Sequence, residues 1–310
     1  MAALTLLLPE LRRIDVPDTS PLARWLARGD ELSKARAGRD VALRECFEFL
    51  GTAFPHAALS RSLESNDGRD AVWLYADPAY VIADAVTVRM LAYGALGLTE
   101  DESRELAKPL KLLFGDASFP LETSASGRWY LRCPSGSRLP SFAPPSQVLG
   151  DDLARHLPSG ENERQWRHLL NEAQVILHNH PVNERRAREG KAPANSLWFW
   201  GAGSLPEWVR TSFAHVASRS DDAIALAKLA KVSIDVSFDS ATIKSTDNVL
   251  FDAAEVSAEL REAALLKIDE ALRAKKLSRV EIKFDDGSRY RYDYSRRWRF
   301  WRPIRSINAQ

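Results

Sequence analysis

The chain has 310 residues, 45% of them hydrophobic, which is enough to build one large domain or two closely packed ones. Its 43 basic and 42 acidic residues nearly cancel, so net charge gives no general reason to expect nucleic acid or an anionic membrane as partner. The two cysteines, Cys46 and Cys133, lack metal-ligand spacing, which predicts a reduced, cytoplasmic setting. No segment approaches the roughly 20 apolar residues of a membrane helix, and no membrane partner is expected.

Short apolar runs and helical spacings alternate through the first half of the chain. The run at 4–8 ends at a proline and predicts a buried strand, and 71–76 predicts a second strand before Asp77-Pro78. Thr99 and Glu102 have the spacing of a capping box at a helix start. Helices are predicted at 20–36, 39–50, 84–95 and 99–113.

The second half continues this alternation. Residues 128–133 predict a strand, followed by an irregular stretch at 134–150. Asp286-Gly287, between two alternating runs, is a strong hairpin signal. Helices are predicted at 161–178, 206–217, 220–230 and 252–275, and strands at 232–236, 280–284 and 288–294.

These elements predict an α/β or α+β fold, with a mixed sheet flanked by helices. We expect residues 1–230 to form one α/β body. Residues 231–310 are expected to add a strand, a helix and a β-hairpin that pack on the same body.

The segment 178–203 concentrates side chains that contact anions. Four cations precede an asparagine and the sequence Gly201-Ala202-Gly203, whose amides could face an anion at a following turn. The other interpretation is a solvated basic turn with glycines needed only for chain geometry, and composition alone favours it. The cations are Arg185, Arg186, Arg188 and Lys191.

The same segment resembles the archaeal-type cofactor-independent phosphoglycerate mutases, over about residues 128–230. The resemblance rests on His180-Pro181-x-Asn183, Gly190-Lys191, Pro193-Ala194-Asn195 and Gly201-Ala202-Gly203. An arginine is expected before that Gly-Ala-Gly sequence, but this chain has Trp200 there. Together with the charges, the resemblance implies a ligand-binding surface made of His180, Asn183, Arg186, Lys191, Asn195, Gly201 and Gly203.

The whole chain more closely resembles a bacterial family of RpfE-type regulatory proteins. Trp73-Leu74-x-Ala76-Asp77-Pro78, Leu113-Phe114-Gly115-Asp116 and Arg297-Trp298-Arg299-Phe300-Trp301-Arg302 carry this resemblance. It implies a link to regulation and supplies no molecular mechanism.

The sequence lacks recognisable metal and nucleophile motifs of the mutases. The resemblance implies two metals held by clustered Asp and His ligands at strand ends, with a Ser or Thr nucleophile. Here the first strand is followed by Pro9-Glu10, the Asp67–Asp70 loop precedes its strand, and no histidine follows His215. We therefore predict no catalytic residue, no metal ligand and no cofactor.

Cations and aromatic residues alternate in the C-terminal segment 296–305. Such a pattern could stack on bases and contact phosphates of a single strand. We favour a terminal segment in which Trp298 and Phe300 pack inward while the arginines face water.

The sequence thus predicts a non-catalytic regulatory protein that keeps part of a phosphoglycerate-mutase-like scaffold. The 178–203 segment would bind a phosphorylated or carboxylate metabolite, or a protein partner. One alternative is a metal-dependent phosphoglycerate mutase or phosphatase. The second is an interaction module that binds nucleic acid or protein through the Arg/Trp-rich C-terminal segment.

Overall fold

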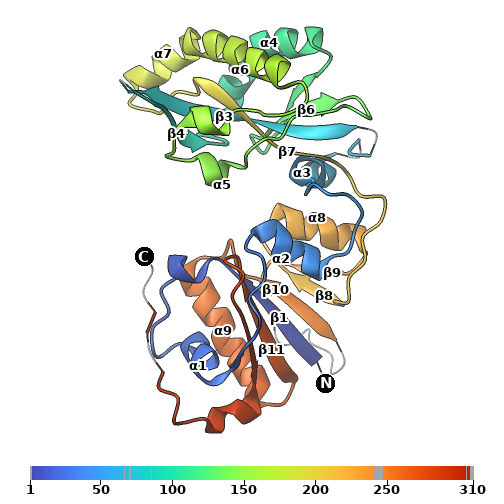
Figure 1. Ribbon diagram of the computed structural model, residues 1–310, viewed down its shortest axis with the longest axis vertical. Helices are drawn as coiled ribbons and strands as arrows, with labels where there is room; N and C mark the ends of the chain where they lie inside the picture. The colour runs from blue at the N-terminus through green and yellow to red at the C-terminus, as the bar shows by residue number, and fades with distance from the viewer. Residues whose placement is uncertain are drawn as a thin grey trace. The chain divides into compact units, whose positions relative to one another are not determined.

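The computed structural model describes residues 2–65, 67–69, 71–84, 86–239, 247–304 and 306–307. The chain forms two compact units (Figure 1): unit 1 comprises Met1–Leu50 and Pro206–Gln310, and unit 2 comprises Gly51–Leu205. The boundary predicted at residue 230 falls inside unit 1. The reason is strand pairing, because the N-terminal strand lies between two strands from the C-terminal third of the chain.

Unit 1 is built on a mixed sheet of seven strands within the described residues, in the order β2-β12-β11-β1-β10-β8-β9. The strands from β11 to β9 run parallel to one another, and β12 and β2 add an antiparallel edge. The strands are β1 (Ala2–Leu8), β2 (Asp30–Glu31), β8 (His215–Ala217), β9 (Ser233–Asp235), β10 (Asn248–Asp252), β11 (Leu277–Phe284) and β12 (Arg289–Asp293).

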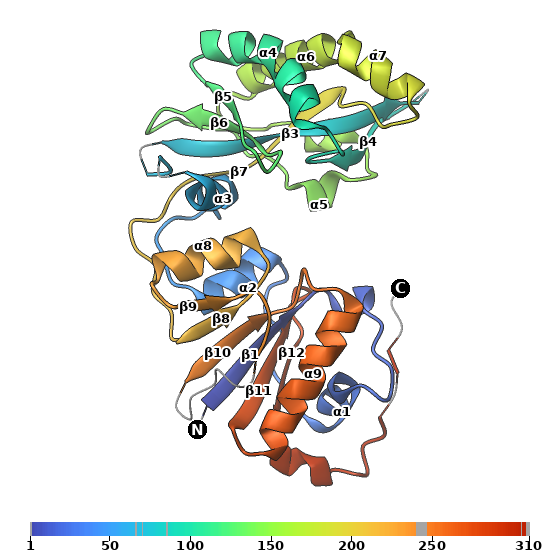
Figure 2. The same ribbon diagram turned by 180° about the vertical axis from the view of Figure 1, so that it is seen from behind.

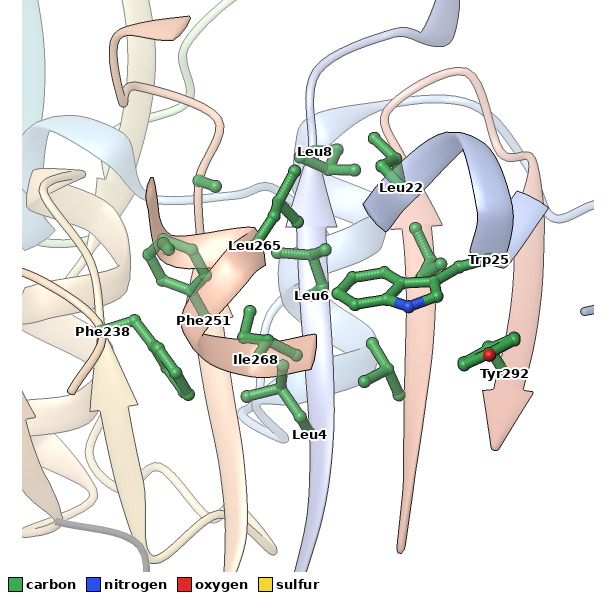
Figure 3. Close-up of a cluster of buried hydrophobic side chains, with 14 of the residues drawn as sticks. Leu4, Leu6, Leu8, Leu22, Trp25, Phe238, Phe251, Leu265, Ile268 and Tyr292 are labelled. Carbon is green, nitrogen blue, oxygen red and sulfur yellow. The ribbon is translucent and has the colours of Figure 1, made fainter. Parts of the chain in front are cut away.

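Helices cover both faces of this sheet (Figure 2): α1 (Pro21–Arg28) and α9 (Ala258–Arg273) lie on one, and α2 (Arg39–Cys46) and α8 (Asp221–Leu229) on the other. Alternate residues of β1, Leu4, Leu6 and Leu8, point to the α1/α9 face. There they pack with Trp25 of α1 and Ile268 of α9 (Figure 3). Because burying such a side chain contributes about 1.5–3 kcal/mol, this layer fixes the register of β1.

Unit 2 contains an antiparallel sheet of five strands within the described residues. The long strand β3 pairs with β4, β6 and β7, and β5 pairs with β6. The strands are β3 (Val72–Ala83), β4 (Val88–Tyr93), β5 (Leu121–Thr123), β6 (Trp129–Cys133) and β7 (Ser196–Ser204).

Helices α4 (Glu100–Asp116), α6 (Glu163–His178) and α7 (Pro181–Arg188) cover one face of this sheet, and α3 (His56–Glu64) packs on the other (Figure 1). The short α5 (Pro145–Val148) packs against β4. The predicted capping box is present, since Glu102 N donates to Thr99 Oγ1 and Thr99 N donates to Glu102 Oε2.

The structure confirms the α/β class with mixed sheet and flanking helices, and corrects two predicted helices. Residues 88–93 of the helix predicted at 84–95 form strand β4, and the helix predicted at 206–217 is absent from that described stretch, which ends in β8. Among the described residues, no helix is both long enough and apolar enough to cross a membrane.

Candidate functional site

The predicted site residues lie in unit 2, and Asn183 of α7 is buried there. Its Nδ2 donates to the carbonyls of Leu177 and Ala194 at 2.7 and 2.9 Å, and its Oδ1 accepts from Ala194 N at 2.9 Å. The amide therefore joins the end of α6 to the strand entering the sheet. This is a different role from the predicted ligand contact, because these bonds use both polar atoms of the side chain.

Arg186 is also internal, with 1% of its surface exposed. Its Nη1 forms a 2.8 Å ion pair with Glu102 and also donates to the carbonyl of Gly97. Its Nε and Nη2 donate to the carbonyls of Ala192 and Leu96. A guanidinium surrounded by these acceptors holds three segments together. The structure thus replaces the predicted anion contact of Arg186 with an internal one.

His180, Lys191 and Asn195 are less buried. His180 caps α7, where its Nδ1 accepts from Val182 N at 3.3 Å, and partial burial lowers its pKa. Lys191 is exposed and pairs with Glu189 at 2.7 Å. Asn195 bonds both backbone groups of Val81 and so extends the pairing of β7 with β3. Of the three, only Lys191 presents its charge to solvent.

Gly201 and Gly203 belong to strand β7 and form no anion-binding turn. Gly203 lies opposite Trp73, and a Cβ at Gly203 would come within 2.5 Å of Pro55. Gly201 has φ +68°, a conformation that favours glycine, and a Cβ there would meet His56 at 2.9 Å. Both glycines face the α3 side of the sheet, whereas α7 lies on the other face (Figure 1). The structure therefore does not gather the seven predicted residues into one site.

Trp200, which stands where an arginine was expected, is paired with a buried carboxyl. Its Nε1 donates to Asp77 Oδ2 at 2.7 Å, and its ring stacks on Tyr75. Asp77 is 2% exposed, and burial raises its pKa to about 6 although Trp200 and Arg128 oppose the shift. Ionisation of this buried carboxyl at neutral pH therefore costs folding free energy.

We expect Asp77→Asn to remove a pH-dependent loss of stability. The folded pKa, about 6, exceeds the unfolded value near 3.9, so the contribution of Asp77 is complete below pH 4 and is lost as pH rises to 6. The difference corresponds to roughly 3 kcal/mol at 1.36 kcal/mol per pKa unit. In urea denaturation at pH 4 and pH 7, the free energy of unfolding of Asp77→Asn relative to the wild type should be higher at pH 7 than at pH 4. The exposed Asp116→Asn is the control, and an equal gain there would contradict the assignment.

The carboxyl edge of the unit 1 sheet gathers a second cluster, which the sequence did not reveal. Because β1, β8, β10 and β11 are parallel, their carboxyl ends lie at one edge, the usual place for ligands in such sheets. Asp252 ends β10 opposite Leu7, and Asp285 follows β11 and donates its N–H to Leu8 O. Two carboxyl groups therefore flank the end of β1.

Arg39, at the start of α2, lies between these carboxyl groups. Its Nη2 donates to Asp252 Oδ2, and its Nη1 is 3.9 Å from Asp285 Oδ1. Asp252 is 1% exposed and also accepts from Ser218 Oγ at 2.8 Å and from Ala254 N at 3.2 Å. Both oxygens of Asp252 are thereby engaged by groups of the chain itself.

The pKa values of the neighbouring acids follow from this crowding. Burial raises the pKa of Asp285 to about 6, against the attraction of Arg39 and with the repulsion of Asp252. Burial and Asp252 likewise raise the pKa of Glu255. One guanidinium thus serves more acidic groups than it can fully neutralise.

The paired metals of the resembling mutases do not fit these residues. A divalent ion needs several free oxygen or nitrogen ligands, and Asp252 already binds a guanidinium, a hydroxyl and an amide. In the part of the chain that the structure describes, no three His, Cys, Asp or Glu side chains are grouped so that they could hold a metal ion. The positive charge at this edge is supplied by Arg39.

Arginines of the C-terminal segment bind other residues of unit 1. Arg299 and Arg296 pair with Asp30 at 2.6 and 2.9 Å, and Arg302 donates to the carbonyl of Gly29. The prediction that Trp298 and Phe300 pack inward is wrong: they are 65% and 77% exposed. The chain turns here in a short 3₁₀ helix, Tyr294–Trp298, instead of continuing as a strand. Arg305 lies outside the described residues.

Comparison with known proteins places one similarity in unit 2. Residues 70–183 match the family described as 2,3-bisphosphoglycerate-independent phosphoglycerate mutase. A probable enzyme of that name from Geobacter sulfurreducens is 34% identical over 120 residues, which are 39% of this chain and 30% of that protein. Its counterpart from Methanosarcina barkeri is 30% identical over 144 residues, 46% of this chain and 36% of that protein. The match thus spans about a third of the length of these curated relatives.

A solved cofactor-independent phosphoglycerate mutase from Thermoplasma acidophilum is 18% identical, with a TM-score of 0.43 over 95% of this chain and 90% of that one. The predicted partial resemblance to these mutases is confirmed, and the matched family segment begins at residue 70 and ends at 183. That segment lies wholly within unit 2, whereas Arg39, Asp252 and Asp285 lie in unit 1.

Proposed function

We propose that this chain is a non-catalytic regulatory protein that keeps part of a phosphoglycerate-mutase-like scaffold. The observation that carries the proposal is the ion pair of Arg39 with Asp252 at the carboxyl edge of unit 1. A metal-assisted phosphoryl transfer needs carboxylate oxygens that are free to hold metal ions. Here Arg39 binds one oxygen of Asp252 and the backbone amide of Ala254 binds the other, so the edge carries its own fixed cation.

The regulatory part of the proposal is supported by the resemblance of the whole chain to RpfE-type proteins. The predicted partner is an anionic metabolite or a protein that meets the 178–203 segment. Because Asn183 and Arg186 are buried, such a partner would contact the exposed cations Arg185, Arg188 and Lys191. Arg185 and Lys191 already have acidic neighbours, Glu105 at 3.6 Å and Glu189 at 2.7 Å. A partner would have to compete with these surface pairs, which are individually weak.

A second candidate is a phosphoglycerate mutase or phosphatase, which the names of the matched relatives favour. One turnover assay distinguishes the two candidates. The purified full chain is incubated with 3-phosphoglycerate, and separately with p-nitrophenyl phosphate, in the presence of added Mn²⁺. An authentic mutase is run in parallel as the positive control.

We expect no turnover above the background of the buffer. Turnover that requires Mn²⁺ and is lost in Asp252→Asn would contradict the non-catalytic proposal and establish the second candidate. Turnover that persists in Asp252→Asn would also contradict it, and would direct attention away from the carboxyl edge of unit 1.

A further inference from the structure

Unit 1 contains a cavity of about 190 Å³ that no predicted function uses. It lies beside the ends of three parallel strands, because its walls include Arg219 after β8, Val236 after β9 and Phe251 near the end of β10. The opposite wall is helix α9. Open parallel sheets commonly bind small molecules at this edge.

The floor of the cavity is apolar. Phe238 and Phe251 are 3% and 2% exposed, and their ring centroids are 5.6 Å apart. Figure 3 shows the two rings next to each other beside α9. Two aromatic rings and small aliphatic groups form a surface that favours an apolar ligand body over water.

Helix α9 contributes one face to the cavity. Leu260, Ala263, Ala264 and Lys267 follow one another at spacings of three, one and three residues, so they lie on the same side of the helix. The two alanines leave room where larger side chains would fill the space. Lys267 adds a positive charge at one end of this face.

Arg219 and Lys267 are the cations of the cavity wall, and both are exposed. Neither forms an ion pair or a side-chain hydrogen bond with any residue that the structure describes. This distinguishes them from Arg39 and Arg299, which are bound to carboxylates. Two unpaired cations beside an apolar floor are complementary to a molecule with one anionic group and an apolar body.

We propose that this cavity binds a small amphipathic carboxylate. The carboxylate would lie at Arg219 and Lys267, and the apolar part against Phe238 and Phe251. An apolar cavity of about 150 Å³ can hold benzene, so this volume suits one aromatic ring or a short alkyl chain. The inference goes beyond the proposed function and does not depend on it, since the residues of the cavity are distinct from Arg39, Asp252 and the 178–203 segment.

The charge requirement is tested by calorimetric titration of the full chain with benzoate and with benzamide, which has nearly the same shape but no charge. Benzoate should bind saturably at about millimolar concentration, as expected for a ligand of this size. It should bind about tenfold more tightly than benzamide, because it can form charge-assisted hydrogen bonds. Equal affinities would overturn the assignment of the cations.

The apolar requirement is tested with butanoate and hexanoate. Each buried methylene should increase the affinity about fourfold until the cavity is full. An affinity that does not change with chain length would overturn the assignment of the floor.

Variants locate the site. Arg219→Gln and Lys267→Gln should each weaken benzoate binding about tenfold, and Ala263→Leu should weaken it by filling the cavity. Lys228→Gln, on α8, is the matched control and should bind benzoate like the wild type. Unfolding midpoints of all four variants should equal that of the wild type. The proposal fails if benzoate does not bind saturably, or if the three cavity variants bind it like Lys228→Gln.

Discussion

Replacing Arg39 with alanine should lower the free energy of unfolding by about 3–5 kcal/mol at pH 7. The substitution removes the cation from Asp252, which is 1% exposed and keeps only a hydroxyl and an amide as partners. A buried carboxylate without its counter-charge is strongly unfavourable. Urea denaturation followed by circular dichroism measures the loss.

The loss caused by Arg39→Ala should also depend on pH. Arg39 opposes the burial that raises the pKa of Asp285, so without the guanidinium protonation of Asp285 relieves part of the cost. The difference from the wild type should therefore be smaller at pH 5 than at pH 7.5. Arg36→Ala is the matched control, since Arg36 is exposed and lies three residues earlier. Adding Asp252→Asn to Arg39→Gln should recover part of the stability that Arg39→Gln alone loses. A loss for Arg39→Ala no greater than for Arg36→Ala would contradict the ion pair.

Arg186→Ala should cost a similar amount, about 3–5 kcal/mol. The variant loses the ion pair with Glu102 and leaves that carboxylate buried, and it also leaves the carbonyls of Leu96 and Ala192 without this donor. Thermal unfolding and urea denaturation at pH 7 measure the effect. Glu102→Gln should recover part of the stability in the Arg186→Ala background.

Arg185→Ala is the matched control for Arg186→Ala, because Arg185 lies at the surface whereas Arg186 is buried. Arg185 precedes Arg186, is 46% exposed in its side chain and lies 3.6 Å from Glu105. An exposed pair of this kind contributes at most about 1 kcal/mol. If Arg185→Ala and Arg186→Ala were equally mild, the internal role of Arg186 would be wrong and a ligand-binding role would regain support.

Elements with local signals could be predicted from the sequence. The capping box of Thr99 and Glu102 marks the start of α4, and Asp286-Gly287 marks the turn between β11 and β12. Helix α6 was predicted with its end at His178, where the structure ends it. In each case the residues that stabilise the element lie within a few positions of one another.

Elements stabilised by distant partners were harder to predict. Strand β4 forms within a stretch of helical spacing because it pairs with β3. Strand β10 is held next to β1 and was not predicted, since its partner is more than 200 residues away. The insertion of unit 2 between residues 50 and 206 of unit 1 leaves no local trace for the same reason.

The candidate site likewise combines features with a local sequence signal and contacts between residues far apart in the chain. Composition identified 178–203 as rich in cations, but it could not show that the donors of Arg186 point to carbonyls inside the unit. Arg39 and Asp252 are 213 positions apart, so no spacing could indicate their pairing. The one available signal was Asp252 directly after the apolar run Val249–Phe251, a position typical of the carboxyl end of a parallel strand.

Arg39 supplies the positive charge at the carboxyl edge of unit 1. The most direct test is the number of Mn²⁺ ions bound by the metal-stripped wild-type chain, measured by equilibrium dialysis at pH 7.5. We expect no stoichiometric binding at micromolar Mn²⁺, because one oxygen of Asp252 is bound by Arg39 and the other by the backbone amide of Ala254. One or two tightly bound ions that disappear in Asp252→Asn would contradict it.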